Sequence, residues 1–421
     1  MTNSKKIFMS ILLTASLAMP TFSANADTIS NNTEEKIRVY VEASDTPTKS
    51  AIKGKFKVRW ELTENGFSTE MTEKQFSALQ KNKKVQVTKV QEVTLDTDIK
   101  VRAANNQVAA AEYPTQQTPW GIKAIYNNSN QTTTSGGQGI NIAVLDTGVN
   151  VNHYDLANTV EQCKNFTGST TVISGCNDGN GHGTHVAGSA LADGGSDGAG
   201  IYGVAPQADL WAYKVLGDNG SGYSDDIAAA IRHTADQATS TGTKTVINMS
   251  LGSSANNSLI SSAVNYAYSK GVLVVAAAGN SGPNQGTIGY PGALVNAVAV
   301  AALENVQQNG TYRVANFSSR GYASTDGDYV IQQGDIEISA PGAAIYSTWN
   351  NGGYNTISGT SMATPHVAGL AAKIWAQNPG WSHTQLRSDL QNRAKNYDIK
   401  GGTGATTGDD YASGFGFARV N

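Results

Sequence analysis

Three polar residues lie at the ends of predicted strands or at the starts of predicted helices, where the secondary structure would fix their positions. Asp146 ends an apolar run, His182 lies between two glycines at the start of an apolar helical pattern, and Ser361 opens another such pattern. A serine hydroxyl is a weak nucleophile until a base removes its proton. A histidine can be that base, and a carboxylate can fix the tautomer of the histidine. The three residue types together predict acyl transfer by an activated serine.

Each of these three signals also has an ordinary structural explanation when it is taken alone. Asp146 could cap a turn, His182 could be a buried histidine, and Ser361 could be the N-cap that serine often provides. The prediction of catalysis therefore depends on the three residues meeting in space.

The remaining histidines raise one further alternative, a zinc site on His182 and His185. Zinc proteases of the H-E-x-x-H type have a glutamate after the first histidine, but here Gly183 and Thr184 intervene. We expect His185 to be structural and His366 to be buried in the helix that follows Ser361. We expect the other histidines to be surface or loop residues, namely His153, His233 and His383.

The elements that must position these residues follow an alternating pattern over residues 111–421. The predicted strands span 140–146, 208–216, 244–252, 271–280 and 295–303, and the predicted helices span 182–192, 224–238, 257–271, 360–379 and 383–395. Apolar strands that alternate with helices are typical of a parallel sheet covered on both faces. We expect an α/β fold with a doubly wound parallel sheet, and a site at the carboxyl ends of its strands.

The first 26 residues have the pattern of a secretory signal peptide. Lys5 and Lys6 precede an apolar run of 12 residues, and Ala24 to Ala26 supply the small residues of a cleavage site. The run is too short for a stable membrane span, although a retained anchor is the alternative. We expect a secreted, extracellular protein without a membrane partner.

Residues 27–110 differ from the rest of the chain in composition. They contain three strand patterns (36–43, 55–62 and 85–95) and one helix pattern (72–80), which predicts a small α+β unit. Residues 1–111 carry 16 Lys and Arg against 12 Asp and Glu, whereas residues 112–421 carry 14 against 21. The opposite net charges indicate two modules that attract each other. The stretch 102–113 reads as an exposed, cleavable linker.

Cys163 and Cys176 are the only cysteines, and they flank a stretch rich in Gly, Ser and Thr. Two cysteines in an exported chain usually pair. We expect a disulfide that closes a surface loop and stabilises the fold by roughly 3 kcal/mol.

Three long motifs carry a resemblance to a known family. AVLDTGV around Asp146, NGHGTHVAG around His182 and SGTSMATPHVAGLAA around Ser361 resemble the active-site motifs of subtilases, in the order Asp, His, Ser. The resemblance covers essentially all of residues 112–421 and is strongest to sphericase-like and cold-adapted Bacillus subtilisins. It implies a serine endopeptidase of broad specificity that acts through an acyl-enzyme with Asp146, His182 and Ser361 as its triad.

The resemblance also implies roles for residues around the triad. In VVAAAGNSG, Asn280 is similar to the asparagine that lines the oxyanion hole, where the backbone N–H of Ser361 would be the second donor. Two extended segments would hold a peptide between them as an added strand, and three further residues would form the pocket for the residue before the scissile bond. These are Gly220, Ser221 and Gly222, then Ser250, Leu251 and Gly252, and for the pocket Ala277, Gly279 and Gly289. Ser281 stands where many subtilisins have glutamate, so we expect a roomy, mainly apolar preference.

Structural calcium is the cofactor that the resemblance implies. Gln116, Asp155 and Asp197 match ligands of the tight calcium site, and backbone carbonyls of the loop 195–201, including Ala199 and Ile201, would complete an oxygen cage. Tyr154 replaces the proline usual before the aspartate. A second acidic group could be a calcium site or a solvated loop, and it comprises Asp326, Asp328, Asp335 and Glu337.

The partners that follow are protein and peptide substrates and the chain's own residues 27–110. By resemblance, this segment is a propeptide that assists folding and inhibits the enzyme until it is cut near residues 109–111. The acidic main part has no basic stripe, which argues against a nucleic-acid partner, and we expect a monomer. The alternative functions are a secreted metallohydrolase and a catalytically dead, peptide-binding relative.

Overall fold

A computed structural model describes residues 35–95, 113–168 and 170–421. The predicted signal peptide and nearly all of the predicted linker lie outside the described residues. The chain divides into Met1–Glu35 and a compact unit, Lys36–Asn421. Within the described residues, no helix is long and apolar enough to cross a membrane.

The N-terminal part of this unit is an α+β structure, as predicted. Its strands and helices are β1 (Lys36–Ala43), α1 (Thr46–Lys53), β2 (Val58–Glu61), β3 (Gly66–Thr72), α2 (Glu73–Leu79), β4 (Val85–Lys89) and β5 (Glu92–Thr94). The first four strands form an antiparallel sheet in the order β2-β3-β1-β4. Val39, Val41, Phe67 and Met71 are fully buried between this sheet and the two helices.

The sequence did not predict α1 or β3 in this region, and β4 and β5 were predicted as one strand. A helix start was readable at α1, because Asp45 caps it and Pro47 lies in its first turn. The side chain of Asp45 accepts a hydrogen bond from Thr48 N at 2.7 Å. β3 has a polar sequence, GFSTEMT, and only its pairing with β1 and β2 makes it a strand.

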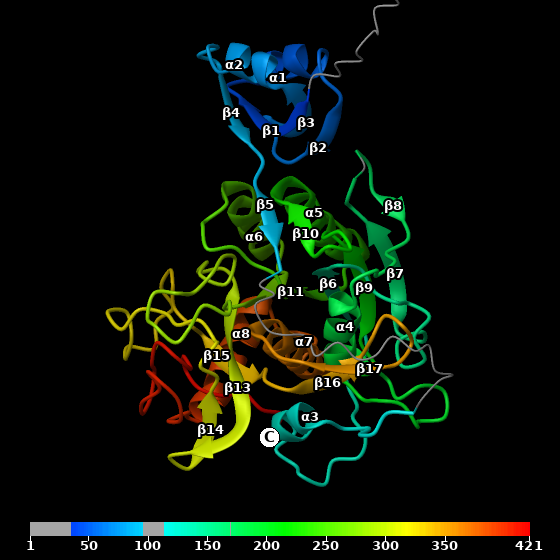
Figure 1. Cartoon of the computed structure of the whole chain (residues 1–421), viewed down its shortest axis with the longest axis vertical. Coiled ribbons are helices and arrows are strands. Elements are labelled where there is room, and N and C mark those ends of the chain that lie inside the picture. The colour runs from blue at the N-terminus through cyan, green and yellow to red at the C-terminus, as the bar shows by residue number, and fades with distance from the viewer. Residues whose placement is uncertain (1–34, 96–112, 169) are drawn as a thin grey trace, which may run out of the picture. The chain divides into compact units, whose positions relative to one another are not determined.

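The main part of the unit is a three-layer α/β structure (Figure 1). Its strands are β6 (Ile140–Asp146), β7 (Val160–Asn165), β8 (Ile173–Ser174), β9 (Asp209–Lys214), β10 (Ser221–Tyr223), β11 (Lys244–Met249), β12 (Leu273–Ala277), β13 (Val298–Gln308), β14 (Thr311–Val314), β15 (Ile338–Pro341), β16 (Ile345–Thr348) and β17 (Tyr354–Ile357). Its helices are α3 (Trp120–Ile125), α4 (His182–Leu191), α5 (Ser224–Thr241), α6 (Ser258–Ser269), α7 (Thr360–Gln377) and α8 (His383–Lys395).

The large sheet confirms the predicted fold class. Its strand order is β14-β13-β12-β11-β6-β9-β7-β8, and β15 also pairs with β13. The strands from β13 to β7 pair in parallel, and the antiparallel edge strands β14 and β8 make the sheet mixed. The five predicted strands and five predicted helices are all present, with boundaries that shift by a few residues.

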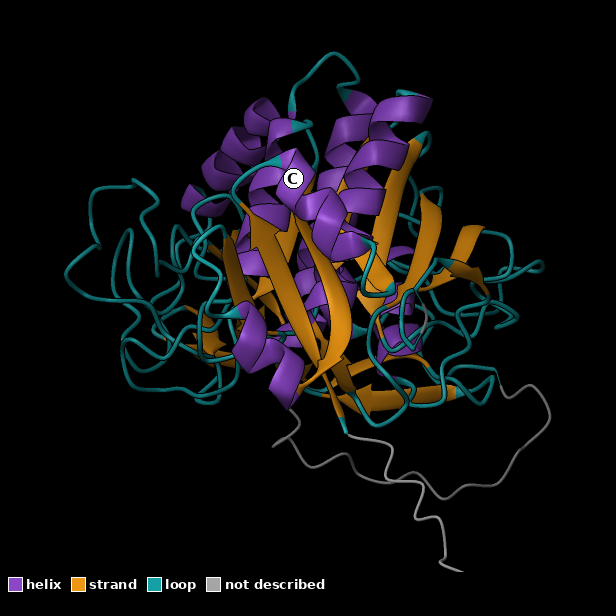
Figure 2. Cartoon of the chain, turned by 90° about the horizontal axis from the view of Figure 1, so that it is seen from above, coloured by secondary structure: helices purple, strands orange, loops and turns teal. Residues whose placement is uncertain are grey.

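The central strand β6 shows why helices cover both faces of the sheet. All seven of its residues are buried. Ile142 and Val144 belong to the core that contains α4 and α7, whereas Ala143 and Leu145 belong to the core that contains α5 and α6. Figure 2 shows the strands with helices packed against them. Successive side chains point to opposite faces, so a continuous apolar strand needs two layers of helices.

The two cysteines form the predicted disulfide, with Cα atoms 5.1 Å apart. It joins β7 to the segment that leads into α4. The backbone oxygen of Cys176 also accepts a hydrogen bond from Val149 N at 2.8 Å. The disulfide therefore braces the approach to His182.

Candidate active site

Asp146 and His182 meet at the carboxyl edge of the sheet. Asp146 is the last residue of β6 and is fully buried, and His182 is the first residue of α4. His182 Nδ1 lies 2.8 Å from Asp146 Oδ1. The same carboxylate oxygen accepts a hydrogen bond from Thr147 N at 2.7 Å. The carboxylate thus fixes the orientation of the imidazole ring.

Asp178 holds the start of α4 in place, a role that the sequence analysis did not identify. Its Oδ1 accepts hydrogen bonds from Thr147 Oγ1 (2.9 Å) and Gly181 N (2.8 Å). Its Oδ2 accepts from Thr184 N (3.0 Å) and Thr184 Oγ1 (2.6 Å). An aspartate just before a helix start was the available signal.

The electrostatic surroundings of His182 raise its pKa. Burial lowers this pKa, but the charge of Asp146 and its hydrogen bond together outweigh burial, and the charge of Asp178 adds to them. A raised pKa favours a ring that can hold a proton.

Ser361 lies in the first turn of α7 and is bonded to Ser250 in both directions. Ser361 Oγ donates to Ser250 O at 3.1 Å, and Ser250 Oγ donates to Ser361 O at 2.7 Å. The second bond compensates for Pro365, whose missing N–H would otherwise bond Ser361 O within the helix. Among the described residues, Ser361 Oγ forms no hydrogen bond with the ring of His182. Such catalytic bonds are often long without substrate.

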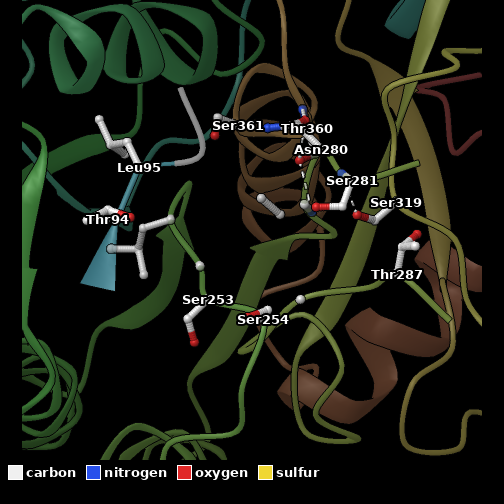
Figure 3. A pocket seen from close by; sticks show the side chains of 15 residues that line it. Thr94, Leu95, Ser253, Ser254, Asn280, Ser281, Thr287, Ser319, Thr360 and Ser361 are labelled. Atoms are coloured by element: carbon white, nitrogen blue, oxygen red, sulfur yellow. Dashed lines mark hydrogen bonds between the residues drawn. The ribbon is translucent and has the colours of Figure 1, made fainter. Parts of the chain in front are cut away.

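Asn280 follows β12 and lies next to Ser361. Its Oδ1 accepts hydrogen bonds from Thr360 N (2.9 Å) and Thr360 Oγ1 (3.1 Å). Because the amide oxygen is held in this way, the Nδ2 donor group lies on the other side of the amide. Figure 3 shows Asn280, Thr360 and Ser361 grouped on one wall of a pocket.

This pocket has a volume of about 360 Å³ and contains several of the predicted substrate residues. Its lining includes Leu251, Gly252, Ala277, Gly279, Asn280, Ser281, Gly289, Ser319 and Ser361. Ser250 is not part of this lining, because it is buried and bonded to Ser361. The hydroxyl groups of Ser281, Thr287 and Ser319 make one wall more polar than the apolar pocket that we expected.

β5, from the N-terminal part of the chain, lies between the two extended segments that were predicted to bind a peptide. β5 pairs antiparallel with β10, so that Thr94 faces Ser221 and Val93 faces Gly222. On its other side, Thr94 forms an antiparallel bridge with Gly252. Leu95 N donates to Gly220 O at 2.9 Å, and Leu95 and Thr94 reach the pocket. β5 is therefore an added strand beside residues 220–222, with a single bridge to Gly252 on its other side.

The buried histidines of α4 and α7 are structural, as predicted. His185 Nε2 lies 2.9 Å from Ile345 O, and burial lowers the pKa of His185 to about 3. His366 Nδ1 lies 2.8 Å from Met362 O, and burial lowers the pKa of His366 to about 4.

The other three histidines were predicted to be surface or loop residues, and of these only His153 lies in a loop. His153 lies in a loop but is only 1% exposed, and its Nε2 is 2.9 Å from Gly353 O. His233 lies on α5 with its ring against Phe166 and Tyr213, and burial lowers its pKa to about 4. His383 begins α8 and is partly exposed.

The candidate calcium loop brings together only part of the predicted ligand set. Asp155 is fully buried, and its Oδ2 accepts hydrogen bonds from Ile201 N (3.1 Å) and Tyr354 (2.7 Å). Its Oδ1 is buried without a hydrogen-bond partner among the described residues, which fits a cation ligand. Tyr154, in the proline position, accepts a hydrogen bond from Asp197 N at 3.0 Å and so contacts the same loop.

The other predicted ligands have different surroundings. Asp197 is exposed, and its Oδ1 accepts from Ala199 N at 2.7 Å. Gln116 is exposed, and it is Gln117 whose Nε2 donates to Gly198 O at 2.8 Å. The described part of the chain contains no group of three or more His, Cys, Asp or Glu residues placed to hold a metal.

The second acidic group separates into Glu337, which immediately precedes β15, and the three aspartates, which lie around Asp409. Glu337 is buried and paired with Arg387 at 2.6 Å, because a buried carboxylate needs a cation. Asp326 is instead close to Asp409 and Asp410. Burial, followed by the charges of Asp409, Asp410 and Asp335, raises the pKa of Asp326 to about 7.

Comparison with known proteins identifies the family. The profile of the Subtilase family matches residues 137–416. The chain belongs to the subtilase family. It is 64% identical over 424 residues to a subtilisin of Bacillus sp. (strain TA39), with all of both chains covered.

Two solved structures are similar to the main part of the chain. Sphericase is 81% identical with a TM-score of 0.73, and the S41 psychrophilic protease is 72% identical with a TM-score of 0.72. Each match covers 73% of this chain and 99% of the other. The chain is accordingly a subtilisin-type serine endopeptidase, and the resemblance inferred from its motifs is confirmed.

Proposed function

We propose that Asp146, His182 and Ser361 are the catalytic triad of this endopeptidase. The observation that carries the proposal is the 2.8 Å contact between His182 Nδ1 and Asp146 Oδ1, next to a pocket that Ser361 and Asn280 line. The contact leaves His182 Nε2 as the nitrogen available to a substrate-side proton.

The proposed reaction is acyl transfer in two steps. Ser361 Oγ leaves Ser250 O, gives its proton to His182 and attacks the peptide carbonyl, and His182 then gives this proton to the leaving amine. Water next attacks the acyl-enzyme with His182 again as the base, the bond between the acyl carbon and Ser361 Oγ breaks, and His182 returns the proton to Oγ. The oxyanion receives hydrogen bonds from Asn280 Nδ2 and Ser361 N–H, and the N-terminus of α7 favours its charge.

We further propose that residues 27–110 are a propeptide that inhibits the enzyme until they are removed. The pairing of β5 between β10 and Gly252 supports this role, because a substrate strand needs the same edges. The segment between β5 and Tyr113, outside the described residues, contains the cleavage position that we propose near residues 109–111. The signal-peptide pattern of residues 1–26 supports the further proposal that residues 111–421 are secreted as the mature enzyme.

Calcium is the structural cofactor that we propose for the loop 195–201. Subtilases as a family bind structural calcium, and the buried Oδ1 of Asp155 is the atom here that best suits it. Backbone carbonyls of the loop, with Gln116 and Asp197, are the remaining proposed ligands. The ion would hold the loop against Asp155 and would take no part in the chemistry.

The test is Ser361→Ala in the full chain. We expect loss of peptide hydrolysis by about a million-fold, the size known for subtilisin itself, and a precursor that stays uncleaved in a protease-free host. A fluorophosphonate probe should label the parent protein on Ser361 and leave the variant unlabelled. Labelling at another residue, or normal hydrolysis by the variant, would exclude this triad. Absent labelling of the parent would favour a metallohydrolase or a dead relative.

A further inference from the structure

An acidic pair at the start of α5 contacts the proposed propeptide outside the substrate cleft. Asp225 and Asp226 lie in the first turn of α5 and are 0% and 1% exposed. Every cation that pairs with them in the described residues belongs to the N-terminal sheet, namely Arg38 on β1 and Arg59 on β2. Removal of residues 27–110 would therefore leave both carboxylates without their cations.

The two carboxylates are not equally compensated. Asp226 Oδ2 accepts a hydrogen bond from Arg38 Nη1 at 2.8 Å. Its Oδ1 accepts from Arg59 Nη2 at 3.2 Å and from Trp60 Nε1 at 2.6 Å. These three donors, two of them charged, satisfy the carboxylate in the way that a buried charge requires.

Asp225 has only long ion pairs. Its oxygens lie 3.5 Å from Arg38 Nη1 and 3.5 Å from Arg59 Nε. Both oxygens are buried without a hydrogen-bond partner among the described residues, and so is Arg59 Nε. The buried hydroxyl of Ser68 also faces Asp225, but it forms no regular hydrogen bond with it.

The charges of the whole cluster do not balance. Glu70 on β3 joins it, with Oε1 at 3.0 Å from Arg59 Nη1 and 3.9 Å from Arg38 Nε. Two guanidinium groups thus face three carboxylates. Tyr223 contributes only its ring, which lies 3.8 Å from the centre of the Arg38 guanidinium. Of the three carboxylates, Asp225 is the one whose two oxygens are both buried without a hydrogen-bond partner among the described residues.

We propose that Asp226 anchors the N-terminal sheet on α5 and that Asp225 weakens the same contact, so that the pair sets how readily the propeptide leaves. This inference rests on the proposed role of residues 27–110. Burying a charge without hydrogen bonds costs free energy, and that cost is recovered when the sheet departs and water reaches Asp225. The contact is thereby specific for a partner with two arginines and a tryptophan, yet still reversible after cleavage.

The test measures opening of the interface in the uncleaved full chain that carries Ser361→Ala. Two amides report on it, because Leu95 N bonds Gly220 O at 2.9 Å and Ser224 N bonds Gln91 O at 2.9 Å across the interface. Hydrogen exchange at these amides is followed in uncleaved molecules by mass spectrometry with gas-phase fragmentation, so the measurement needs no proteolytic activity of the protein. If this background is still cleaved, the proposed triad fails while the intact fraction still reports on docking.

Two substitutions at neighbouring positions should act in opposite directions. We expect Asp226→Asn to speed exchange at least tenfold, because Arg38 and Arg59 lose their hydrogen-bonded partner. We expect Asp225→Asn to slow exchange about three- to tenfold, because the cluster then has balanced charge. Asp236→Asn, on the exposed surface of the same helix, is the matched control and should change nothing.

Two results would each overturn the proposal. One is unchanged or faster exchange in Asp225→Asn, and the other is unchanged exchange in Asp226→Asn. If Asp226→Asn does not fold, Arg59→Gln is the second variant. It removes the hydrogen bond between Arg59 and Asp226 from the propeptide side and should also speed exchange at least tenfold. Circular dichroism of each variant confirms the fold before exchange is compared.

The dependence on pH gives a second readout. Burial and then the charge of Asp226 raise the pKa of Asp225 in the docked state. A group with a raised pKa favours docking at low pH and opposes it as the pH rises. The effect of Asp225→Asn relative to the background should therefore grow with pH and disappear in acid. A constant effect would contradict the assigned charge.

Discussion

Two regions of the molecule bury a pair of carboxylates, and they differ in where the compensating groups come from. Asp146 and Asp178 receive their hydrogen bonds from residues of the main part of the chain, at sequence separations between 1 and 36. Asp226 receives its side-chain hydrogen bonds from residues of the N-terminal sheet, at sequence separations between 166 and 188.

This difference decides which of these contacts would persist after the proposed removal of residues 27–110. The donors around His182 would remain, so the ring would keep its orientation. The donors around Asp226 would leave together with the segment that carries them. A buried carboxylate pair can thus serve either a permanent site or a temporary contact, according to the origin of its hydrogen-bond donors.

The largest expected effect tests the permanent pair. Asp146→Asn should lower kcat by about 10⁴-fold, the size known for this substitution in a chymotrypsin-type triad, because the amide favours the wrong tautomer of His182. Steady-state hydrolysis of a peptide substrate measures it, with Asp236→Asn as a control for loss of a surface charge. A loss below tenfold would mean that Asp146 does not orient His182.

A smaller effect concerns the brace between β7 and the start of α4. Replacing both Cys163 and Cys176 with serine should destabilise the fold by roughly 3 kcal/mol, from the loop entropy of a separation of 13 residues. Urea unfolding in the Ser361→Ala background measures it without autolysis, and the unreduced parent is the reference. An unchanged unfolding midpoint would show that the surrounding strand pairing suffices.

The smallest effect concerns the acid limb of activity. The pKa of His182 is raised by Asp146 against the effect of burial, and the ring must be neutral to accept the proton of Ser361. The rise of kcat/KM with pH should therefore be centred above 6.5, the ordinary value of histidine, and activity should fall up to tenfold per pH unit below it. Asp178→Asn should move the limb to lower pH, since its charge contributes to the shift. A limb centred below 6.5 would contradict this electrostatic assignment.

Most of the fold was predictable, because its main strands are apolar along their whole length. Near-continuous runs such as 140–146 can only be buried on both faces, and the helical periodicity of 383–395 gives α8 with its observed bounds. β3 was not predictable, since its polar sequence becomes a strand only by pairing with β1 and β2.

The candidate site was predictable in its residue types and less so in its support. The motifs around Asp146, His182 and Ser361 are local in sequence, and glycines and helix starts mark them. The supporting contacts of the site join residues whose spacing in the sequence has no pattern. Examples are the hydrogen bonds of Asp178, those between Ser250 and Ser361, and the contact that buries His153 against Gly353.

The sequence by itself determined the parallel sheet, the order of the three motifs and the division into two oppositely charged parts, because periodicity, motif and charge are local properties. Only the tertiary structure decided which of two adjacent aspartates is compensated. Asp225 and Asp226 are the same residue type in the same helical turn. Their difference arises from where the guanidinium groups of a distant sheet come to lie, and geometry of that kind is absent from a one-dimensional pattern.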